Sequence, residues 1–98
     1  MPVFSLIVQG NPKDLANKIS SLIFDRREWK NLYRSKIEQR GQNEFIVSYW
    51  SDQGIFHDCW IDAIIKRIND THCIVSFETC NCSEMTELVK IVAKNLES

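Results

Sequence analysis

The sequence has 98 residues, of which 44% are hydrophobic and 26% are charged, with only three Gly and two Pro. This length fits one domain, residues 1–98, and the composition excludes disordered, collagen-like and low-complexity chains. The net charge of −1 is unevenly distributed, because Lys and Arg are concentrated in residues 25–40 and acidic residues predominate from residue 44 onward. Such asymmetry affects the choice of a binding partner rather than the fold.

The sequence also bears on the location of the protein. No apolar run approaches the ~20 residues that a membrane-spanning helix needs, so we expect no membrane partner. The first residues contain no basic region of the kind that opens a signal peptide. We therefore expect a cytoplasmic protein that keeps its cysteines reduced. These cysteines are Cys59, Cys73, Cys80 and Cys82.

The first half of the chain predicts a strand, a helix and a segment with two interpretations. Apolar and polar residues alternate over residues 3–9, which predicts a strand. Asn11 and Pro12 are typical of an N-cap and a first helical residue, and the apolar spacing extends this helix to residue 24. Residues 25–40 fit either a helix or a hairpin strand that turns at residues 40–43; we favour the strand and keep the helix open.

The second half predicts a strand, a helix, a strand and a final helix. Residues 44–50 and 72–78 alternate with the period of a strand. Residues 52–68 have a broad apolar face at helical spacing and predict the strongest helix of the chain. A last helix is expected from Ser83, with acidic residues in its first turn and lysines towards its end.

Three predicted strands share a pattern that indicates how the sheet is covered. Each has one apolar face and one mixed face with a serine near its centre, at Ser5, Ser48 and Ser76. Strands buried on both faces would be apolar throughout, so we expect helices on one face only. The predicted fold is α+β, of the ferredoxin-like split βαβ type (β-α-β-β-α-β), with an additional C-terminal helix and one sheet face covered by helices.

Cysteine and histidine residues are frequent between residues 57 and 82. A zinc site needs about four ligands, which are usually supplied by two short-spaced pairs. Cys80 and Cys82 form one such pair and no second pair exists, so we expect no metal. A redox role of these two thiols in a predicted loop stays open. Three isolated glycines form no phosphate-binding loop, so we expect no cofactor either.

One group of residues has the composition of an acid–base site. His57 lies beside Asp58 and near Asp52 and Asp62, and a histidine next to carboxylates suits general-base catalysis. However, Asp58, Asp62 and Lys66 are spaced by four residues, which is typical of a solvated helix face. We therefore predict no catalytic residue and regard an enzyme as the weaker interpretation.

Two further features suggest binding partners. Residues 26–40 interleave cations with Trp29 and Tyr33, a composition that suits single-stranded nucleic acid. The isoelectric point of about 6.1 is low for such a protein, so nucleic acid ranks third among our hypotheses. Trp50 lies on the mixed sheet face and Trp60 on a helix with surplus apolar surface. Both observations favour a protein partner or a homodimer.

The segment from Phe45 to Phe77 resembles small bacterial immunity proteins that accompany contact-dependent growth-inhibition toxins. The resemblance rests on the strand end Ser48-Tyr49-Trp50-Ser51 and on a following helix that carries Trp60. Such proteins bind one cognate toxin, often a nuclease, and commonly present an acidic surface to its basic active site. The resemblance implies a partner-binding surface in this chain, formed by Trp50, Asp52, Asp58 and Asp62. Our leading hypothesis is therefore an immunity or inhibitor protein.

The alternative hypothesis is a dimeric α+β-barrel protein similar to small monooxygenases. That group shares the β-α-β-β-α-β order, and it has a strand-end tryptophan followed by Ser-Asp and Phe-His. The matching residues here are Trp50-Ser51-Asp52 and Phe56-His57. In such proteins the sheets of two copies pack face to face, which would suit a mixed open face.

Overall fold

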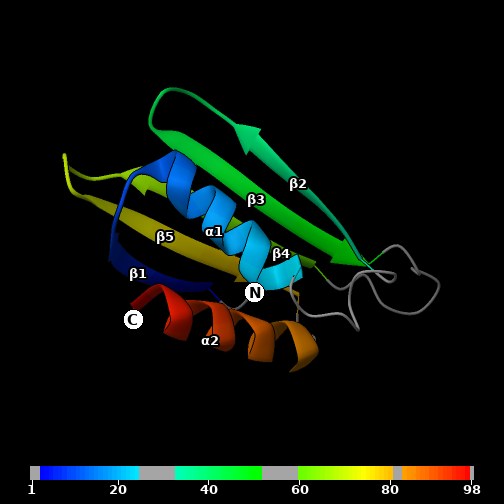
Figure 1. The fold of residues 1–98 in the computed structure, drawn as a ribbon. Helices are drawn as coiled ribbons and strands as arrows, with labels where there is room; N and C mark the ends of the chain where they lie inside the picture. Colours follow the sequence, from blue (N-terminus) through cyan, green and yellow to red (C-terminus); the bar gives the residue numbers. More distant parts are fainter. Residues whose placement is uncertain (1–2, 25–32, 52–59, 81–82, 98) are drawn as a thin grey trace.

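The computed structural model describes residues 3–24, 33–51, 60–80 and 83–97. Seven elements follow one another along the chain (Figure 1). They are β1 (Val3–Gln9), α1 (Pro12–Phe24), β2 (Tyr33–Gln39), β3 (Glu44–Ser51), β4 (Trp60–Arg67), β5 (His72–Thr79) and α2 (Ser83–Glu97). The structure confirms the strands predicted over residues 3–9, 44–50 and 72–78. It also confirms the helix predicted to end at residue 24 and the helix predicted from Ser83.

The five strands form one antiparallel sheet in the order β1-β5-β4-β3-β2. Strands β2 to β5 are consecutive neighbours, and β1 lies at the far edge beside β5 because α1 carries the chain across the sheet. The α+β class is thus confirmed, but the ferredoxin-like β-α-β-β-α-β order is wrong. The order along the chain is β-α-β-β-β-β-α.

The difference lies in the segment predicted as the strongest helix, residues 52–68. From Trp60 onward this segment is strand β4, and residues 52–59 lie outside the described residues. Alternate residues Ile61, Ala63 and Ile65 are at most 1% exposed, while their neighbours face the other side. Residues four apart share one face in a helix and also in a strand. The apolar spacing of this segment therefore fitted a helix although the segment forms a strand.

The ambiguous segment over residues 25–40 contains strand β2, so the hairpin interpretation is confirmed from Tyr33 onward. Residues 25–32 lie outside the described residues. The predicted turn follows directly, and its geometry is closed by the backbone bond from Arg40 N to Glu44 O at 2.9 Å. Gly41 has a φ of +139°, a conformation that favours glycine at this tight reversal.

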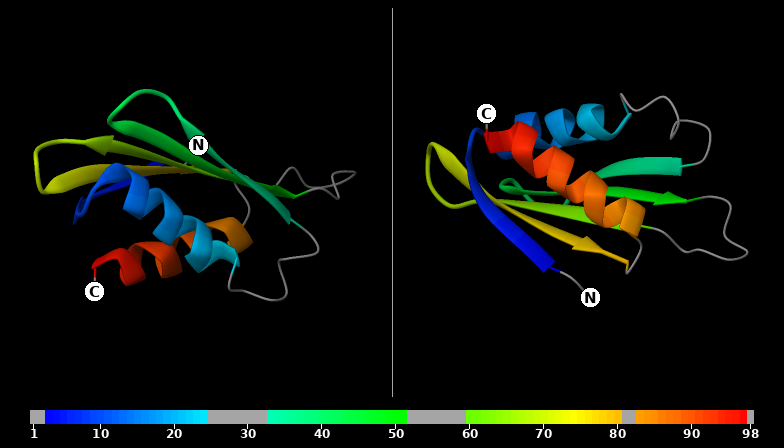
Figure 2. Two further views of the ribbon diagram at one scale, coloured as in Figure 1. Left: turned by 45° about the horizontal axis from the view of Figure 1, so that its top comes forward. Right: turned by 90° about the horizontal axis from the view of Figure 1, so that it is seen from below.

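Both helices lie on the same face of the sheet, as predicted (Figure 2). Helix α1 packs over β3 and β4, and α2 contacts β1, β4 and β5. The apolar sides of the helices and the alternate residues of the strands form one core. Its largest fully buried members are Tyr49, Phe77, Ile19, Ile61, Ile65 and Leu88. The opposite face of the sheet has no described element over it; we call it the open face.

The start of α1 shows the predicted N-cap. Asn11 Oδ1 accepts a hydrogen bond from Asp14 N at 2.8 Å, and Asn11 Nδ2 donates to Asp14 Oδ2 at 2.6 Å. Gly10, directly before the cap, has a φ of +143°, and its N–H donates to Thr71 O at 2.9 Å. These bonds fix the reversal from β1 into α1 and so place the helix over the sheet.

Candidate functional site

The open face is formed by side chains that alternate away from the helices. The predicted serines lie on it in two adjacent rows: Ser48 pairs with Asp62, and Ser5 Oγ donates to Ser76 Oγ at 3.0 Å between paired positions of β1 and β5. Ile46 on β3 and Ile64 on β4 continue the row of Ser5 and Ser76. The prediction of a mixed face with serine at its centre is therefore confirmed.

Trp50 and Trp60 lie directly opposite each other on β3 and β4. Asn43 and Arg67 are opposite each other in the same register, and Arg67 N donates to Asn43 O at 3.0 Å, so these two residues form a hydrogen-bonded pair. Hydrogen-bonded and non-hydrogen-bonded pairs alternate along antiparallel strands, so the two tryptophans form a non-hydrogen-bonded pair. In such pairs the side chains come closest to each other. Both side chains are half-buried, so part of each indole faces solvent.

Asp62 is the next open-face residue of β4 after Trp60, and in a strand such neighbours are about 7 Å apart. Its register partners are Ser48 on β3 and Glu78 on β5. The two carboxylates therefore face each other on adjacent central strands, next to the tryptophan pair. We call the four residues Trp50, Trp60, Asp62 and Glu78 the acidic–aromatic patch.

An acidic pair at this place costs stability, because like charges directly opposite each other in a sheet repel. The patch also leaves half-buried indole surface beside carboxylates rather than beneath a helix. Aromatic rings and carboxylates together can accept a cation, the rings through their π faces and the carboxylates through charge-assisted hydrogen bonds. The patch therefore has the chemistry to bind Lys or Arg side chains.

The structure brings together two of the four residues predicted to bind a partner, Trp50 and Asp62. The other two, Asp52 and Asp58, lie outside the described residues. Sequence reasoning missed Glu78, although the alternation of β5 already placed it on the mixed face with Ser76. It also assigned Trp60 to a helix, because the segment that contains it was predicted as helical.

The thiols are placed in structural roles where the structure describes them. Cys73 is fully buried, and its Sγ donates to Gly10 O at 3.3 Å. Burial raises the pKa of the Cys73 thiol, and the positive charge of Arg67 partly offsets this effect. Cys80 Sγ accepts a hydrogen bond from Trp60 N at 3.3 Å, and Cys80 N donates to Trp60 O at 3.2 Å. Cys59 and Cys82 lie outside the described residues.

Within residues 3–24, 33–51, 60–80 and 83–97, no three His, Cys, Asp or Glu side chains form a group that could hold a metal ion. His72 is engaged locally, with Nδ1 at 2.6 Å from Thr71 Oγ1. Asp52, His57 and Asp58, three of the four residues with the composition of an acid–base site, lie outside the described residues. Neither described helix is long and apolar enough to cross a membrane.

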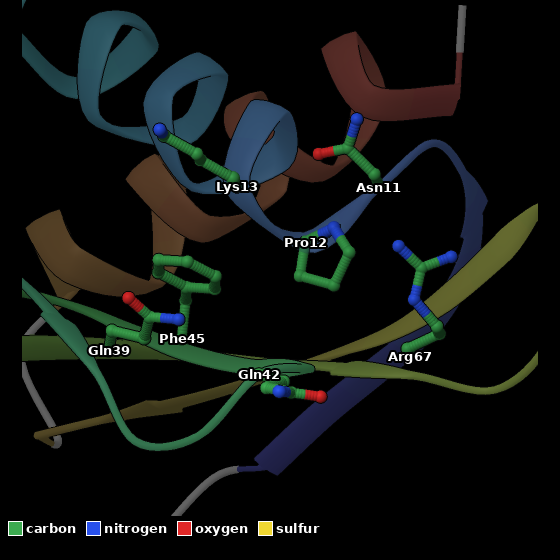
Figure 3. A pocket seen from close by; sticks show the side chains of 7 residues that line it. All are labelled: Asn11, Pro12, Lys13, Gln39, Gln42, Phe45 and Arg67. Atoms are coloured by element: carbon green, nitrogen blue, oxygen red, sulfur yellow. The ribbon is translucent and has the colours of Figure 1, made fainter.

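A cavity of about 370 Å³ lies between the start of α1, the β2–β3 turn and the end of β4 (Figure 3). Its lining residues are Asn11, Pro12, Lys13, Gln39, Gln42, Phe45 and Arg67. The Arg67 guanidinium is held by Asn43 Oδ1 at 3.2 Å and by the carbonyls of Asn69 and Asp70 at 3.3 and 3.4 Å. These bonds join two turns of the sheet, so Arg67 has a structural role here. None of these residues was singled out from the sequence for function.

No protein-family model matches the sequence, and a search of curated proteins gives no match. Among solved structures, the chain is similar to the crystal structure of the vertebrate conserved region (VCR) of human METTL16. The TM-score is 0.49 with 13% sequence identity, over 97% of this chain and 94% of that chain.

Proposed function

We propose that this chain is a protein-binding domain that captures a basic partner on its open sheet face. The observation that carries the proposal is the acidic–aromatic patch, in which Asp62 faces Glu78 next to the Trp50–Trp60 pair. Tryptophans are frequent binding hot spots, and carboxylates beside them select Lys and Arg. A partner that supplies such cations would relieve the repulsion between the two acids.

In its most specific form, the proposed partner is a basic toxin domain, which this chain would neutralise by covering the toxin's active surface. This form depends on the sequence resemblance to immunity proteins. Part of that resemblance no longer applies, because Trp60 begins a strand rather than lying on a helix. The strand end Ser48–Ser51 remains, with Trp50 on the open face, so the proposal rests mainly on the patch.

The other two hypotheses have less support. The dimeric-barrel hypothesis depended on a β-α-β-β-α-β order, and the observed order has a strand at the fifth position. Nucleic-acid binding would require cations at the tryptophans. Arg34 on β2 is the register partner of Trp50, but the neighbours of the tryptophan pair on β4 and β5 are Asp62 and Glu78. These carboxylates would repel phosphates.

The proposal is tested by affinity capture from the native host with three forms of the chain. These are the wild type, a patch variant with Asp62→Lys and Glu78→Lys, and a control variant with Asp70→Lys. Asp70 is exposed in the β4–β5 turn, so the control makes the same kind of charge reversal away from the patch. We expect one basic protein to be retained by the wild type and the control and lost by the patch variant.

The interaction is then measured directly by isothermal titration with the purified partner. We expect the patch variant to weaken binding at least tenfold and Trp60→Ala to weaken it by a similar factor. Affinity should fall at high salt, because the contacts are between opposite charges. If the patch variant and the Asp70→Lys control bound equally well, the open face would not be the binding surface.

A further inference from the structure

The two edges of the sheet are chemically different. Strand β2, at one edge, carries Arg34, Lys36 and Glu38, whereas β1 at the other edge reads Val-Phe-Ser-Leu-Ile-Val-Gln. Charged side chains protect an edge strand from pairing with another chain, and so does proline. Strand β1 has neither over its seven residues, so it lacks the protection that β2 has.

Strand β1 is at the edge of the sheet, and within the described residues no strand pairs with the backbone groups on its outer side. Gly10 N donates to Thr71 O at 2.9 Å, and continuing the β1–β5 register places these two residues opposite each other. In an antiparallel ladder the bonded residues alternate, so the even-numbered residues of β1 bond to β5. The N–H and C=O groups of the odd-numbered residues therefore point away from the sheet. These residues are Val3, Ser5, Ile7 and Gln9.

The side chains of β1 are also more exposed than those of the inner strands. Ile7 is 65% exposed on the open face, and Phe4 is 48% exposed on the helix face. The Phe4 ring has its centroid 6.4 Å from that of Phe77, so one side of it packs against β5. An uncharged edge with apolar side chains on both faces is a predicted site of strand addition.

We propose that β1 pairs antiparallel with β1 of a second copy of this chain. In the register centred on Leu6, Val3 lies opposite Gln9 of the second copy and Ser5 lies opposite Ile7. This register bonds all four outward-facing residues of each strand, for a total of about eight backbone hydrogen bonds. Registers shifted by two residues leave some of these groups unpaired, so this one is favoured.

The side chains are self-complementary in the same register. On the helix face Leu6 meets Leu6 of the second copy, and Phe4 meets Val8, which covers the exposed part of its ring. No like charges oppose each other, because β1 carries no charge. Helix α2 contacts β4 and β5 as well as β1, so it packs against the inner strands and not against the edge strand alone.

The dimer has one continuous sheet, with the open faces of both copies on the same side. This goes beyond the proposed function because it uses the sheet edge and not the acidic–aromatic patch. The two patches remain available and lie on one surface, so a partner with two basic sites would bind with avidity. The interface is small, and we expect reversible association in the micromolar range.

Sedimentation velocity from about 5 to about 500 µM tests the proposal. We expect the wild type to shift from the 11.5 kDa monomer towards twice that mass as the concentration rises. Ile7→Lys should remain monomeric, because its charge sits on the pairing edge. Ile37→Lys on β2, where the isoleucine is 39% exposed, places the same charge on the other edge and should dimerise like the wild type.

Two results would overturn the proposal: a wild type that stays monomeric over the whole range, or an Ile7→Lys variant that dimerises as the wild type does. Circular dichroism confirms that each variant is folded; if Ile7→Lys is not, Gln9→Lys replaces it, since Gln9 is also exposed on β1. Trp50→Ala should leave dimerisation unchanged, which separates the edge from the open face.

Amide hydrogen exchange measured by NMR tests the backbone pairing itself. We expect the amides of Ser5 and Ile7 to become protected at high protein concentration, whereas those of Leu6 and Val8 are protected at every concentration. Protection of Ser5 and Ile7 that does not depend on concentration would contradict strand pairing between copies.

Discussion

Asp62 on β4 and Glu78 on β5 lie directly opposite each other on the open face. Both side chains are partly exposed, and the paired positions lie on two central strands of the sheet. Like charges in directly opposite positions destabilise an antiparallel pair by roughly 0.2–1 kcal/mol. A residue pair that lowers stability at the surface is expected where function requires it, as the proposed binding of a basic partner does.

We predict that Asp62→Asn raises the free energy of unfolding by up to about 1 kcal/mol at low ionic strength, because it removes this repulsion. The gain should shrink in high salt, where surface charges are screened. Urea denaturation at low and high salt measures both effects. Asp70→Asn removes the same charge from an exposed turn and is the matched control. Equal changes in the two variants would show that general charge, and not the Glu78 contact, is responsible.

The two glycines with positive φ allow backbone strain to be separated from a steric contact. Gly10 and Gly41 have φ values of +143° and +139°. A Cβ at Gly10 would lie 3.2 Å from Leu15 Cγ, whereas a Cβ at Gly41 would have nothing within 4 Å. Leu15 is a buried core residue of α1, so its side chain has little room to move.

We predict that Gly10→Ala destabilises the fold by about 1–3 kcal/mol and that Gly41→Ala costs less. Both variants introduce the same unfavourable φ, and only the first also displaces Leu15. Thermal and urea unfolding of the two variants measure the difference. A larger loss for Gly41→Ala would mean that the β2–β3 turn, and not the β1–α1 reversal, limits stability.

Tyr49 makes the stability of the fold depend on pH at the alkaline end. Its side chain is 1% exposed, and burial raises its pKa from 10.0 to about 12. Above pH 10 the unfolded chain releases the phenol proton while the folded chain keeps it. The stabilisation is therefore fully present below pH 10 and is lost as the pH rises through about 12.

We expect the wild type to lose up to roughly 3 kcal/mol of stability between pH 10 and 12 through this group. Tyr49→Phe lacks the ionisable phenol, so its stability should fall less steeply over the same range. Urea denaturation at several pH values measures both slopes, and the difference between them cancels contributions from Lys and Cys. Parallel slopes would show that Tyr49 ionises as freely in the folded chain as in the unfolded one.

Much of this architecture could be predicted from local sequence patterns. The alternation of apolar and polar residues predicted β1, β3 and β5, and Asn11-Pro12 predicted the start of α1. The serines indicated which face of the sheet is open. Strand β4 could not be predicted in this way. Its apolar residues are so frequent that they fit both the period of a helix, 3.6 residues, and that of a strand, 2 residues. The segment is a strand because it pairs with β3 and β5.

The prediction of the candidate site depended on whether the segment that contains Asp62 is a helix or a strand. As part of a helix, Asp62 would lie beside Asp58 and Lys66; as part of β4, it lies between Ser48 and Glu78. These neighbours come from other segments of the chain, and their register follows from the β3–β4 and β4–β5 ladders. A single sequence does not specify that register, so Glu78 could be placed on the mixed face but not opposite Asp62.

Two adjacent isoleucines on β4 test its strand geometry and the one-sided covering of the sheet. Ile65 is fully buried beneath the helices, whereas Ile64 lies on the open face and is partly exposed. We predict that Ile65→Ala costs about 2–5 kcal/mol, because it leaves a cavity in the core. Ile64→Ala removes the same atoms from the open face and should cost clearly less. Chemical denaturation of both variants measures the ratio. Comparable losses would show that the open face is covered as well, and the proposed binding surface would then have to be sought elsewhere.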